Sequence, residues 1–357
     1  MKITFQPRRE LTRLQSIVIL LCSLGVGFVL VGCVFILKGV NPFYAIYSIF
    51  KGSFGSFYGI KETITKAIPL ILIGCGLTLA FQGKFWNIGA EGQLILGAVF
   101  STWIALNIGP HVPAIVAIPL MMIGAFIGGA LWAFIPAILK VRFGINEVIS
   151  TLMFNYISFE IVKFLIIGPW KGATKSGYPY TDDFPASSVI KMLPGSRIHL
   201  LTLIVALFAA VILFLLIYKT RFGYEVRVIG ENPDAARYAG ISYFKTAALT
   251  MVISGGIAGL AGMGEVAGIH HHLTYPENIS AGYGFTAIIV AWLAGLNPLL
   301  VLISGIFFAG ITVGGDAIQI SLNLPAVTVD VFNGILLFAL IVGEYFRNHK
   351  LIIEGKK

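Results

Sequence analysis

The sequence predicts an all-α, polytopic membrane protein of about ten transmembrane helices. Of its 357 residues, 57% are hydrophobic and 11% are charged, and the mean hydropathy is +0.90. Soluble domains carry about 25% charged residues, so a water-soluble fold has no way to bury this much apolar surface. Apolar runs of about 20 residues, the length that crosses a ~30 Å hydrocarbon layer, recur along the chain. We therefore expect one membrane domain over residues 16–346.

The N-terminal residues 1–15 are polar and basic, and we expect them to be cytoplasmic. The apolar run from Ser16 to Leu37 is too long for the apolar core of a signal peptide and has no small-residue cleavage site, so it is predicted to be a retained first span. The three cysteines lie inside apolar runs without metal or disulfide spacing and are interpreted as packing residues.

The topology follows from the basic residues of the short loops. The ten expected spans are 16–37, 62–82, 88–108, 113–139, 147–168, 198–218, 246–269, 282–296, 298–314 and 326–346. Cytoplasmic loops are enriched in Lys and Arg, and with a cytoplasmic N-terminus most of the basic residues fall inside. The net charge of +9 is thereby explained without nucleic acid. Both termini, including the tail 347–357, are then expected on the cytoplasmic face of a bacterial inner membrane.

The block of spans two to five begins outside and the block of spans seven to ten begins inside, an arrangement that fits two inverted halves of five helices each. The loop 169–197 is expected outside, and its prolines and aromatic residues favour an ordered cap. The loop 219–245 is the longest stretch expected in the cytoplasm. Glycines spaced four apart, as in Gly255 and Gly259, predict closely packed helices.

Polar residues gather where two spans begin. Asn87, Glu91 and Gln93 mark the cytoplasmic start of the third span, where Asn87 and Glu91 fit either helix-terminal roles or a substrate pathway. Asn155 lies deeper in the fifth span, where an amide needs a partner or water, which favours a pathway role. The run His270–His272 has no accompanying ligand at metal spacing and is interpreted as a loop.

The cytoplasmic loop predicts one short helix with defined ends. Asn232 fits an N-cap, Pro233 the first helical position and Gly240 a left-handed terminator. A helix of about two turns is unstable alone in water and must pack on something. It either enters a groove of a partner or lies on the surface of its own chain. The sequence contains no nucleotide-binding G-x-x-x-x-G-K-[ST] motif and no recognisable nucleophile motif, so we expect a transporter subunit rather than an enzyme.

Two motifs carry a resemblance to a known family. The segment from Gly230 to Ile241, together with Ser254–Gly262, resembles the permeases of the branched-chain amino acid and simple-sugar group of ABC importers. The stretches Phe85–Gln93, Asn146–Tyr156 and Gly282–Ile288 are similar to the nucleoside-importer branch of that group. The sequence departs from the family at Ala281, where proline is common.

The resemblance implies a permease of the type II importer kind that works by alternating access. Its partners would be a second, similar permease chain, ABC ATPase subunits that hold the ATP and Mg²⁺, and an external binding lipoprotein that delivers a nucleoside, with membrane lipid around it. No cofactor or metal is expected in this chain. A simple-sugar permease and an ion-driven secondary transporter are the alternatives. The residues implied to couple to the ATPase are Glu231, Asn232, Pro233, Asp234, Ala235, Ala236, Arg237 and Gly240, and the pathway candidates are Trp86, Asn87, Glu91, Gln93, Asn155 and Phe285.

Overall fold

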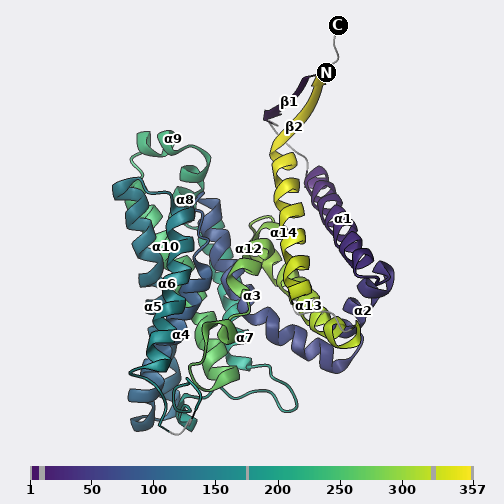
Figure 1. Cartoon of the computed structure of the whole chain (residues 1–357). Helices are drawn as coiled ribbons and strands as arrows, with labels where there is room; N and C mark the ends of the chain where they lie inside the picture. Colours follow the sequence, from purple (N-terminus) through teal and green to yellow (C-terminus); the bar gives the residue numbers. More distant parts are fainter. Residues whose placement is uncertain (1, 8–12, 174–176, 323–326, 355–357) are drawn as a thin grey trace. The chain divides into compact units, whose positions relative to one another are not determined.

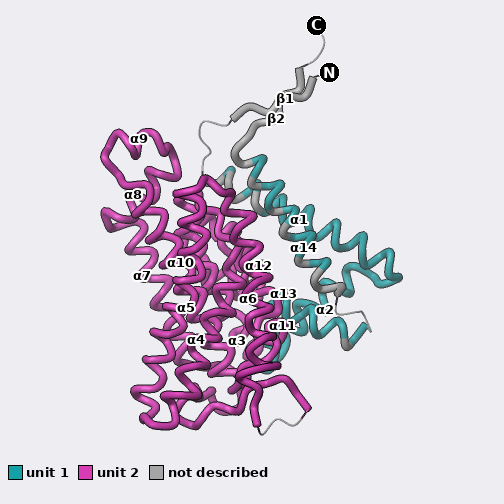
Figure 2. Tube along the Cα trace, turned by 60° about the vertical axis from the view of Figure 1, so that its left-hand side comes forward, with its two compact units in different colours: residues 1–59, 310–357 teal, residues 60–309 magenta. Residues whose placement is uncertain are grey.

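The computed structural model describes residues 2–7, 13–173, 177–322 and 327–354 (Figure 1). The described chain is predominantly helical, which confirms the all-α class. It forms two compact units (Figure 2). Residues 1–59 and 310–357 make up the first unit, and residues 60–309 make up the second.

The first unit contains both ends of the chain. Its helices are α1 (Arg13–Leu37), α2 (Pro42–Phe54), the later part of α13 (Pro298–Leu322) and α14 (Val327–Asn348). α1 packs against α14, where the rings of Phe28 and Phe332 meet edge to face with centroids 6.2 Å apart. The axes of α1 and α2 differ by 112°. The Asn41 side chain starts α2 after this bend, since its Oδ1 accepts the backbone N–H of Phe43 at 2.9 Å.

A two-stranded ribbon joins the two ends of the chain. β1 (Lys2–Pro7) pairs antiparallel with β2 (His349–Glu354), so that Lys2 lies opposite Glu354 and Pro7 lies opposite His349. These are the only strands among the described residues, and Figure 1 shows them side by side. Paired strands cannot lie on opposite faces of a membrane, so both ends are on one side. That this side is the cytoplasm stays a prediction.

The second unit is a bundle of long and short helices. They are α3 (Phe57–Gln82), α4 (Ala90–Asn107), η1 (Gly109–His111), α5 (Ala114–Phe143), α6 (Glu147–Ile167), η2 (Ala186–Ser188), α7 (Leu200–Lys219), α8 (Arg221–Glu231), α9 (Pro233–Tyr238), α10 (Tyr243–Glu265), η3 (Val266–His270), α11 (Pro276–Ile279), α12 (Tyr283–Leu293) and the start of α13. α4, α5 and α10 pack closely. A Cβ on Gly97 would lie 2.3 Å from the Cα of Gly259, so only glycine allows this approach. The predicted close packing of glycine faces is confirmed.

The number of spans differs from the sequence prediction. Within the described residues, seven helices are long and apolar enough to cross a membrane, or eight if the bent pair α1 and α2 is one span. The count of ten is therefore not confirmed. The expected span 282–296 forms only α12, which has 11 residues and is about 16 Å long, too short to cross a ~30 Å layer. The inverted repeat stays a prediction.

The loop between α6 and α7 is held against η3 and the residue that follows it. The backbone N–H of Phe184 donates to the carbonyl of His271 at 2.8 Å, and the N–H of Ile190 donates to the carbonyl of Ala267 at 2.9 Å. The expected order of this loop is confirmed for its described residues. Of the three histidines, His271 and His272 lie in a loop as expected, whereas His270 belongs to a helix. His270 ends the π-helix η3, and the Nδ1 of His272 lies 3.3 Å from the Oδ1 of Asp183.

Candidate functional site

The polypeptide breaks between α3 and α4 and folds back into the bundle. Lys84 has a left-handed backbone with φ of 53°, and the N–H of Phe85 donates to the carbonyl of Ala80 at 2.9 Å, which closes the end of α3. The Phe85 side chain is buried. The backbone at the break is therefore held in place, and it fixes the positions of the next two residues, Trp86 and Asn87.

Two buried amides pair with each other beside the break. Asn87 Nδ2 donates to Gln93 Oε1 at 2.9 Å, and Gln93 Nε2 donates to Asn87 Oδ1 at 2.7 Å. Asn87 Nδ2 also donates to the hydroxyl of Ser254 on α10 at 3.1 Å. The N-cap position of α4 is Gly89, so Asn87 is not the helix cap that the sequence allowed. Its amide instead ties the break to α4 and α10.

A third amide satisfies the backbone of the break. Asn155 on α6 accepts the N–H of Gly92 at 2.9 Å through Oδ1 and donates from Nδ2 to the carbonyl of Ile88 at 3.0 Å. The hydroxyl of Thr151 accepts the N–H of Ile88 at 3.3 Å. Buried backbone groups without partners are costly in a membrane, and here α6 supplies the partners. Both ends of the Asn155 amide are therefore engaged in holding the chain.

The Glu91 carboxylate joins the starts of two helices. It lies buried in the first turn of α4, and its Oε2 accepts the N–H of Gly284 in the first turn of α12 at 2.6 Å. A carboxylate near helix N-termini is favoured by their partial positive charge. Glu91 therefore locks α12 to α4.

Two of the six pathway candidates are aromatic and exposed. Trp86 is 43% exposed and Phe285 is 38% exposed. The Trp86 ring stacks on that of Trp292 with centroids 5.7 Å apart. Trp292 and Phe285 are seven residues apart in α12 and so lie on one face of that helix. We call Trp86, Trp292 and Phe285 the aromatic strip. Trp292 was not predicted from the sequence, although its spacing from Phe285 could have indicated it.

The predicted short helix is present with the predicted ends. α9 begins at Pro233, and the Asn232 side chain accepts the N–H of Asp234 at 3.0 Å and of Ala235 at 3.1 Å. Gly240 has a left-handed backbone with φ of 74°. A second helix, α8, precedes α9 and was not predicted. The local structure of the predicted helix is confirmed, whereas its coupling role stays a prediction.

The faces of α9 separate the predicted coupling residues. Ala236 is buried in an apolar cluster with Phe85, Ile229 and Met251, so its side chain contacts its own protein. Tyr238 is 94% exposed, and sequence reasoning had not selected it. The other predicted coupling residues, all exposed, are Glu231, Asn232, Pro233, Asp234, Ala235, Arg237 and Gly240. The surface open to a partner therefore consists of these seven residues and Tyr238.

These features define a multi-pass membrane protein with a buried, hydrogen-bonded chain break and a short exposed helix. Residues 59–341 match the family described as the permease component of branched-chain amino acid transport systems, and the chain belongs to this permease family. It is therefore the membrane-spanning permease subunit of an importer of the ABC class.

Three relatives cover nearly the whole chain. A glucose ABC transporter permease protein of Haloferax volcanii is 33% identical over 93% of this chain and 87% of its own length. A guanosine ABC transporter permease protein of Bacillus subtilis is 33% identical over 91% of this chain and 93% of its own length. A nucleoside ABC transporter permease protein of Lactococcus lactis is 30% identical over 95% of this chain and 93% of its own length.

Proposed function

We propose that this permease carries nucleosides. The observation that supports this cargo is the aromatic strip, in which Trp86 and Phe285 are partly exposed and the rings of Trp86 and Trp292 stack on each other. Stacking of a nucleobase on an aromatic side chain contributes about 1–3 kcal/mol of binding free energy, and every base can stack in this way because each has a π face. The Bacillus and Lactococcus relatives are named for guanosine and for nucleosides. A stacking surface of this strength binds a base without trapping it, as passage requires.

The second candidate cargo is a simple sugar. The Haloferax relative, as similar as the Bacillus one, is named for glucose. A sugar can also lay a C–H face on an aromatic ring, but it carries more hydroxyl groups than a nucleoside and would be expected to need more exposed polar side chains. Asn87, Glu91, Gln93 and Asn155 are buried and already hydrogen-bonded within the protein. This arrangement favours the nucleoside.

We infer that the four buried polar candidates position the pathway and do not contact the cargo. Asn87 and Gln93 hold the residues on either side of the break, and Asn155 holds its backbone. Glu91 fixes α12, which bears two members of the aromatic strip. Their common effect is to set the position of Trp86 against Trp292.

The exposed face of α9 is the proposed contact with the ATPase. Tyr238 and Arg237 stand exposed beside the small side chain of Ala235, and Tyr and Arg are the residue types that most often dominate interfaces. The opposite face, through Ala236, packs in the cluster that contains Phe85. Phe85 immediately precedes Trp86. A push on α9 would therefore reach the aromatic strip through packed side chains.

The remaining partners complete an importer of this class. We propose that a second, similar permease chain, a pair of ABC ATPase sites and an external binding lipoprotein assemble with this subunit in the bacterial inner membrane. Both termini and the segment 219–245 would face the cytoplasm, and the loop 169–197 would face outward. ATP and Mg²⁺ would bind the ATPase, and this chain would hold no cofactor or ATPase site of its own.

The cargo is tested with the whole complex reconstituted in liposomes. Labelled guanosine is added outside the liposomes, ATP is supplied on the side that carries the ATPase, and uptake of the label is measured. Unlabelled guanosine and adenosine should compete strongly, and glucose, ribose and leucine weakly. If glucose competed at the same concentrations as guanosine, the proposed cargo would be a sugar and not a nucleoside. That result would not change the assignment of the chain to the permease family.

The coupling surface is tested at Ala235, which is exposed on α9. Ala235→Glu should lower co-purification of the ATPase and uptake together, because a charged side chain would be buried unpaired at the interface. Ala235→Ser keeps a small side chain and should retain both. The amount of inserted permease should be equal in the two variants. Normal uptake and ATPase binding by Ala235→Glu would mean that α9 is a surface helix without a coupling role.

A further inference from the structure

One face of α6 is exposed along the whole helix. α6 is a candidate membrane span of 21 residues. Its large exposed side chains recur at intervals of three or four residues, which places them on one side of the helix. They are Ile149, Met153, Tyr156, Glu160, Phe164 and Ile167. The other side packs in the bundle, where Thr151 and Asn155 hold the chain break. The exposed side must therefore meet lipid, water or another chain.

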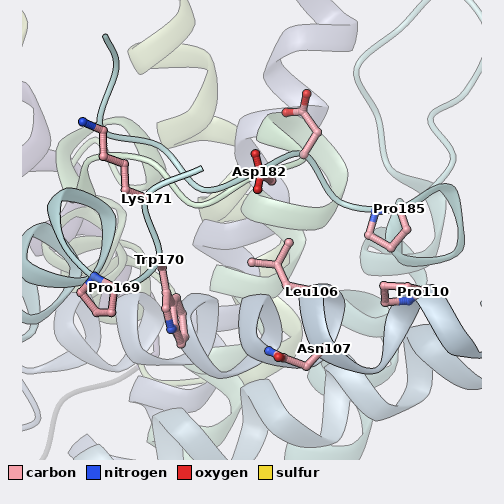
Figure 3. A pocket seen from close by; sticks show the side chains of 9 residues that line it. Leu106, Asn107, Pro110, Pro169, Trp170, Lys171, Asp182 and Pro185 are labelled. Carbon is pink, nitrogen blue, oxygen red and sulfur yellow. The ribbon is translucent and has the colours of Figure 1, made fainter. Parts of the chain in front are cut away.

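Glu160 lies at a depth where hydrocarbon surrounds the bundle. It is seven residues from Ile167, the last residue of α6, which is about 10 Å along the helix. Beyond that end the chain reaches a polar cavity of about 450 Å³, lined in part by Trp170, Lys171 and Asp182 (Figure 3). Trp residues favour the boundary between hydrocarbon and headgroups, so Trp170 marks this boundary. The short side chain of Glu160 does not span the distance to it.

The exposed carboxylate sets α6 apart from two neighbouring spans. On α7 the exposed side chains between Leu200 and Leu215 are all apolar, and on α5 so are those between Ile123 and Ile135. The Glu160 side chain, in contrast, is 72% exposed. An ion that faces hydrocarbon at this depth is costly, so charged residues within spans face a water-filled cavity or a partner. The exposed faces of α5 and α7 fit lipid, whereas that of α6 does not.

Glu160 belongs to an ion cluster that leads to the aromatic strip. The Nζ of Lys163 lies 3.2 Å from Oε1 of Glu160 and 3.3 Å from Oε1 of Glu277 on α11. We call these three residues the ion cluster. Residues 280–282 join α11 to α12, which bears Phe285 and Trp292 of the aromatic strip. The ion cluster therefore lies close in the chain to the end of α12 at which the strip begins.

The ion cluster fits contact with water better than contact with another chain. Its two carboxylates share one ammonium group, so the cluster is net negative, and the two carboxylates are 72% and 55% exposed. Burying the surplus charge in an interface without a matching cation is costly. A two-fold related copy of this chain would bring a second negative cluster to the same place. A water-filled passage avoids both penalties.

We propose that the exposed face of α6 lines the cargo pathway and that Glu160 accepts hydrogen bonds from the ribose hydroxyls of the nucleoside. This inference rests on the proposed function. The cargo then meets Glu160 and the aromatic strip in the same passage. Glu160 is a specificity-determining residue, which favours ribonucleosides over 2′-deoxyribonucleosides.

The chemistry of the ion cluster suits ribose. A carboxylate has about four positions at which it accepts hydrogen bonds, and the contact with Lys163 uses one of them. The 2′ and 3′ hydroxyls of ribose are neighbouring donors, and an acidic side chain binds the ribose 2′ hydroxyl in dinucleotide-binding folds. Lys163 holds the Glu160 carboxylate in place without covering it. A hexose would leave further hydroxyl groups without partners at this site.

The first experiment asks whether water reaches this face of α6. The three native cysteines are replaced by alanine, and one cysteine is introduced by Tyr156→Cys in α6 or, as the matched control, by Phe208→Cys in α7. Both parent side chains are 62% exposed and lie near the middle of their helices. A charged thiol reagent should label Tyr156→Cys in the reconstituted complex and leave Phe208→Cys unlabelled, because the reactive thiolate forms in water. Equal labelling, or none at Tyr156→Cys, would overturn the proposed pathway face.

The second experiment measures selectivity for ribose. Uptake of guanosine and of 2′-deoxyguanosine by the whole complex is compared at saturating concentrations with the same binding protein, so that the ratio of the two rates reports on the permease. The parent should carry guanosine about tenfold faster, the effect of one hydrogen bond to a charged group. Glu160→Ala should bring the ratio to about one. Glu225→Ala truncates another ion-paired glutamate, 3.1 Å from Arg221 in α8, and should keep the parent ratio.

The amount of assembled complex is measured for each variant, and Glu160→Gln, which keeps the size of the side chain, should give an intermediate ratio. If the parent carries guanosine but its ratio is about one, or if the ratio is the same in the parent and the Glu160 variants, the inference is wrong and the proposed cargo stands. If the parent does not carry guanosine, the proposed cargo is wrong. Labelling of Tyr156→Cys would then still decide whether this face of α6 lines the pathway.

Discussion

Gly284→Ala should destabilise the permease because it drives a methyl group into the start of α4. A Cβ at Gly284 would lie 2.3 Å from the backbone nitrogen of Glu91 and 2.7 Å from its Cα, and these backbone atoms have no room to swing away. Forced repacking of a tight core costs about 1–3 kcal/mol. Weakening the 2.6 Å hydrogen bond from Gly284 to the carboxylate costs a further ~1.5–3 kcal/mol. The two effects sum to about 2.5–6 kcal/mol.

The assay is thermal unfolding of the purified permease in detergent, followed by the loss of the monodisperse peak in size-exclusion chromatography. Gly284→Ala should lower the midpoint by roughly 3–8 °C. The matched control is Gly25→Ala in α1, where no atom beyond its own stretch of helix lies within 4 Å of the added methyl group and alanine favours the helix. Equal midpoints for the two variants would refute the claim that Glu91 and Gly284 lock α12 to α4.

Three further predictions test other parts of the account. Ala236→Leu should lose about 1–3 kcal/mol of stability by overpacking, whereas Ala235→Leu should stay within about 0.5 kcal/mol of the parent, as thermal unfolding will report. Trp86→Ala should raise the KM for guanosine about tenfold by removing a stacking face, and an unchanged KM would remove Trp86 from the pathway. In intact cells, a cysteine at Tyr178 should react with an impermeant reagent and one at Tyr224 should not; the reverse would invert the predicted topology.

Sequence reasoning worked where the signal is local. Composition and the length of apolar runs indicate membrane helices because crossing hydrocarbon requires them. The ends of α9 were predictable because Asn232, Pro233 and Gly240 each act on the backbone within three residues. Close glycine packing in α10 was predictable for the same reason, since the spacing of four places the glycines on one face.

The failures concern contacts that join distant parts of the chain. Asn155 satisfies the backbone of Gly92 across 63 residues, and Glu91 reaches Gly284 across 193. A polar residue in an apolar run looks the same whether its partner is cargo or backbone, so its role depends on packing. The buried face of α9 at Ala236 depends likewise on where α8 places it. The shortness of α12 is hidden because apolar residues continue beyond Leu293 after the helix has ended.

The central claim is that ATP hydrolysis by a partner, and no ion gradient, drives cargo through this subunit. The most direct measurement is uptake of labelled guanosine by liposomes that contain the whole complex, with ATP supplied or withheld and with the proton gradient imposed or collapsed by an ionophore. The account predicts uptake whenever ATP is present, unchanged by the ionophore, and none with a gradient alone. Uptake that follows the proton gradient without ATP would contradict it.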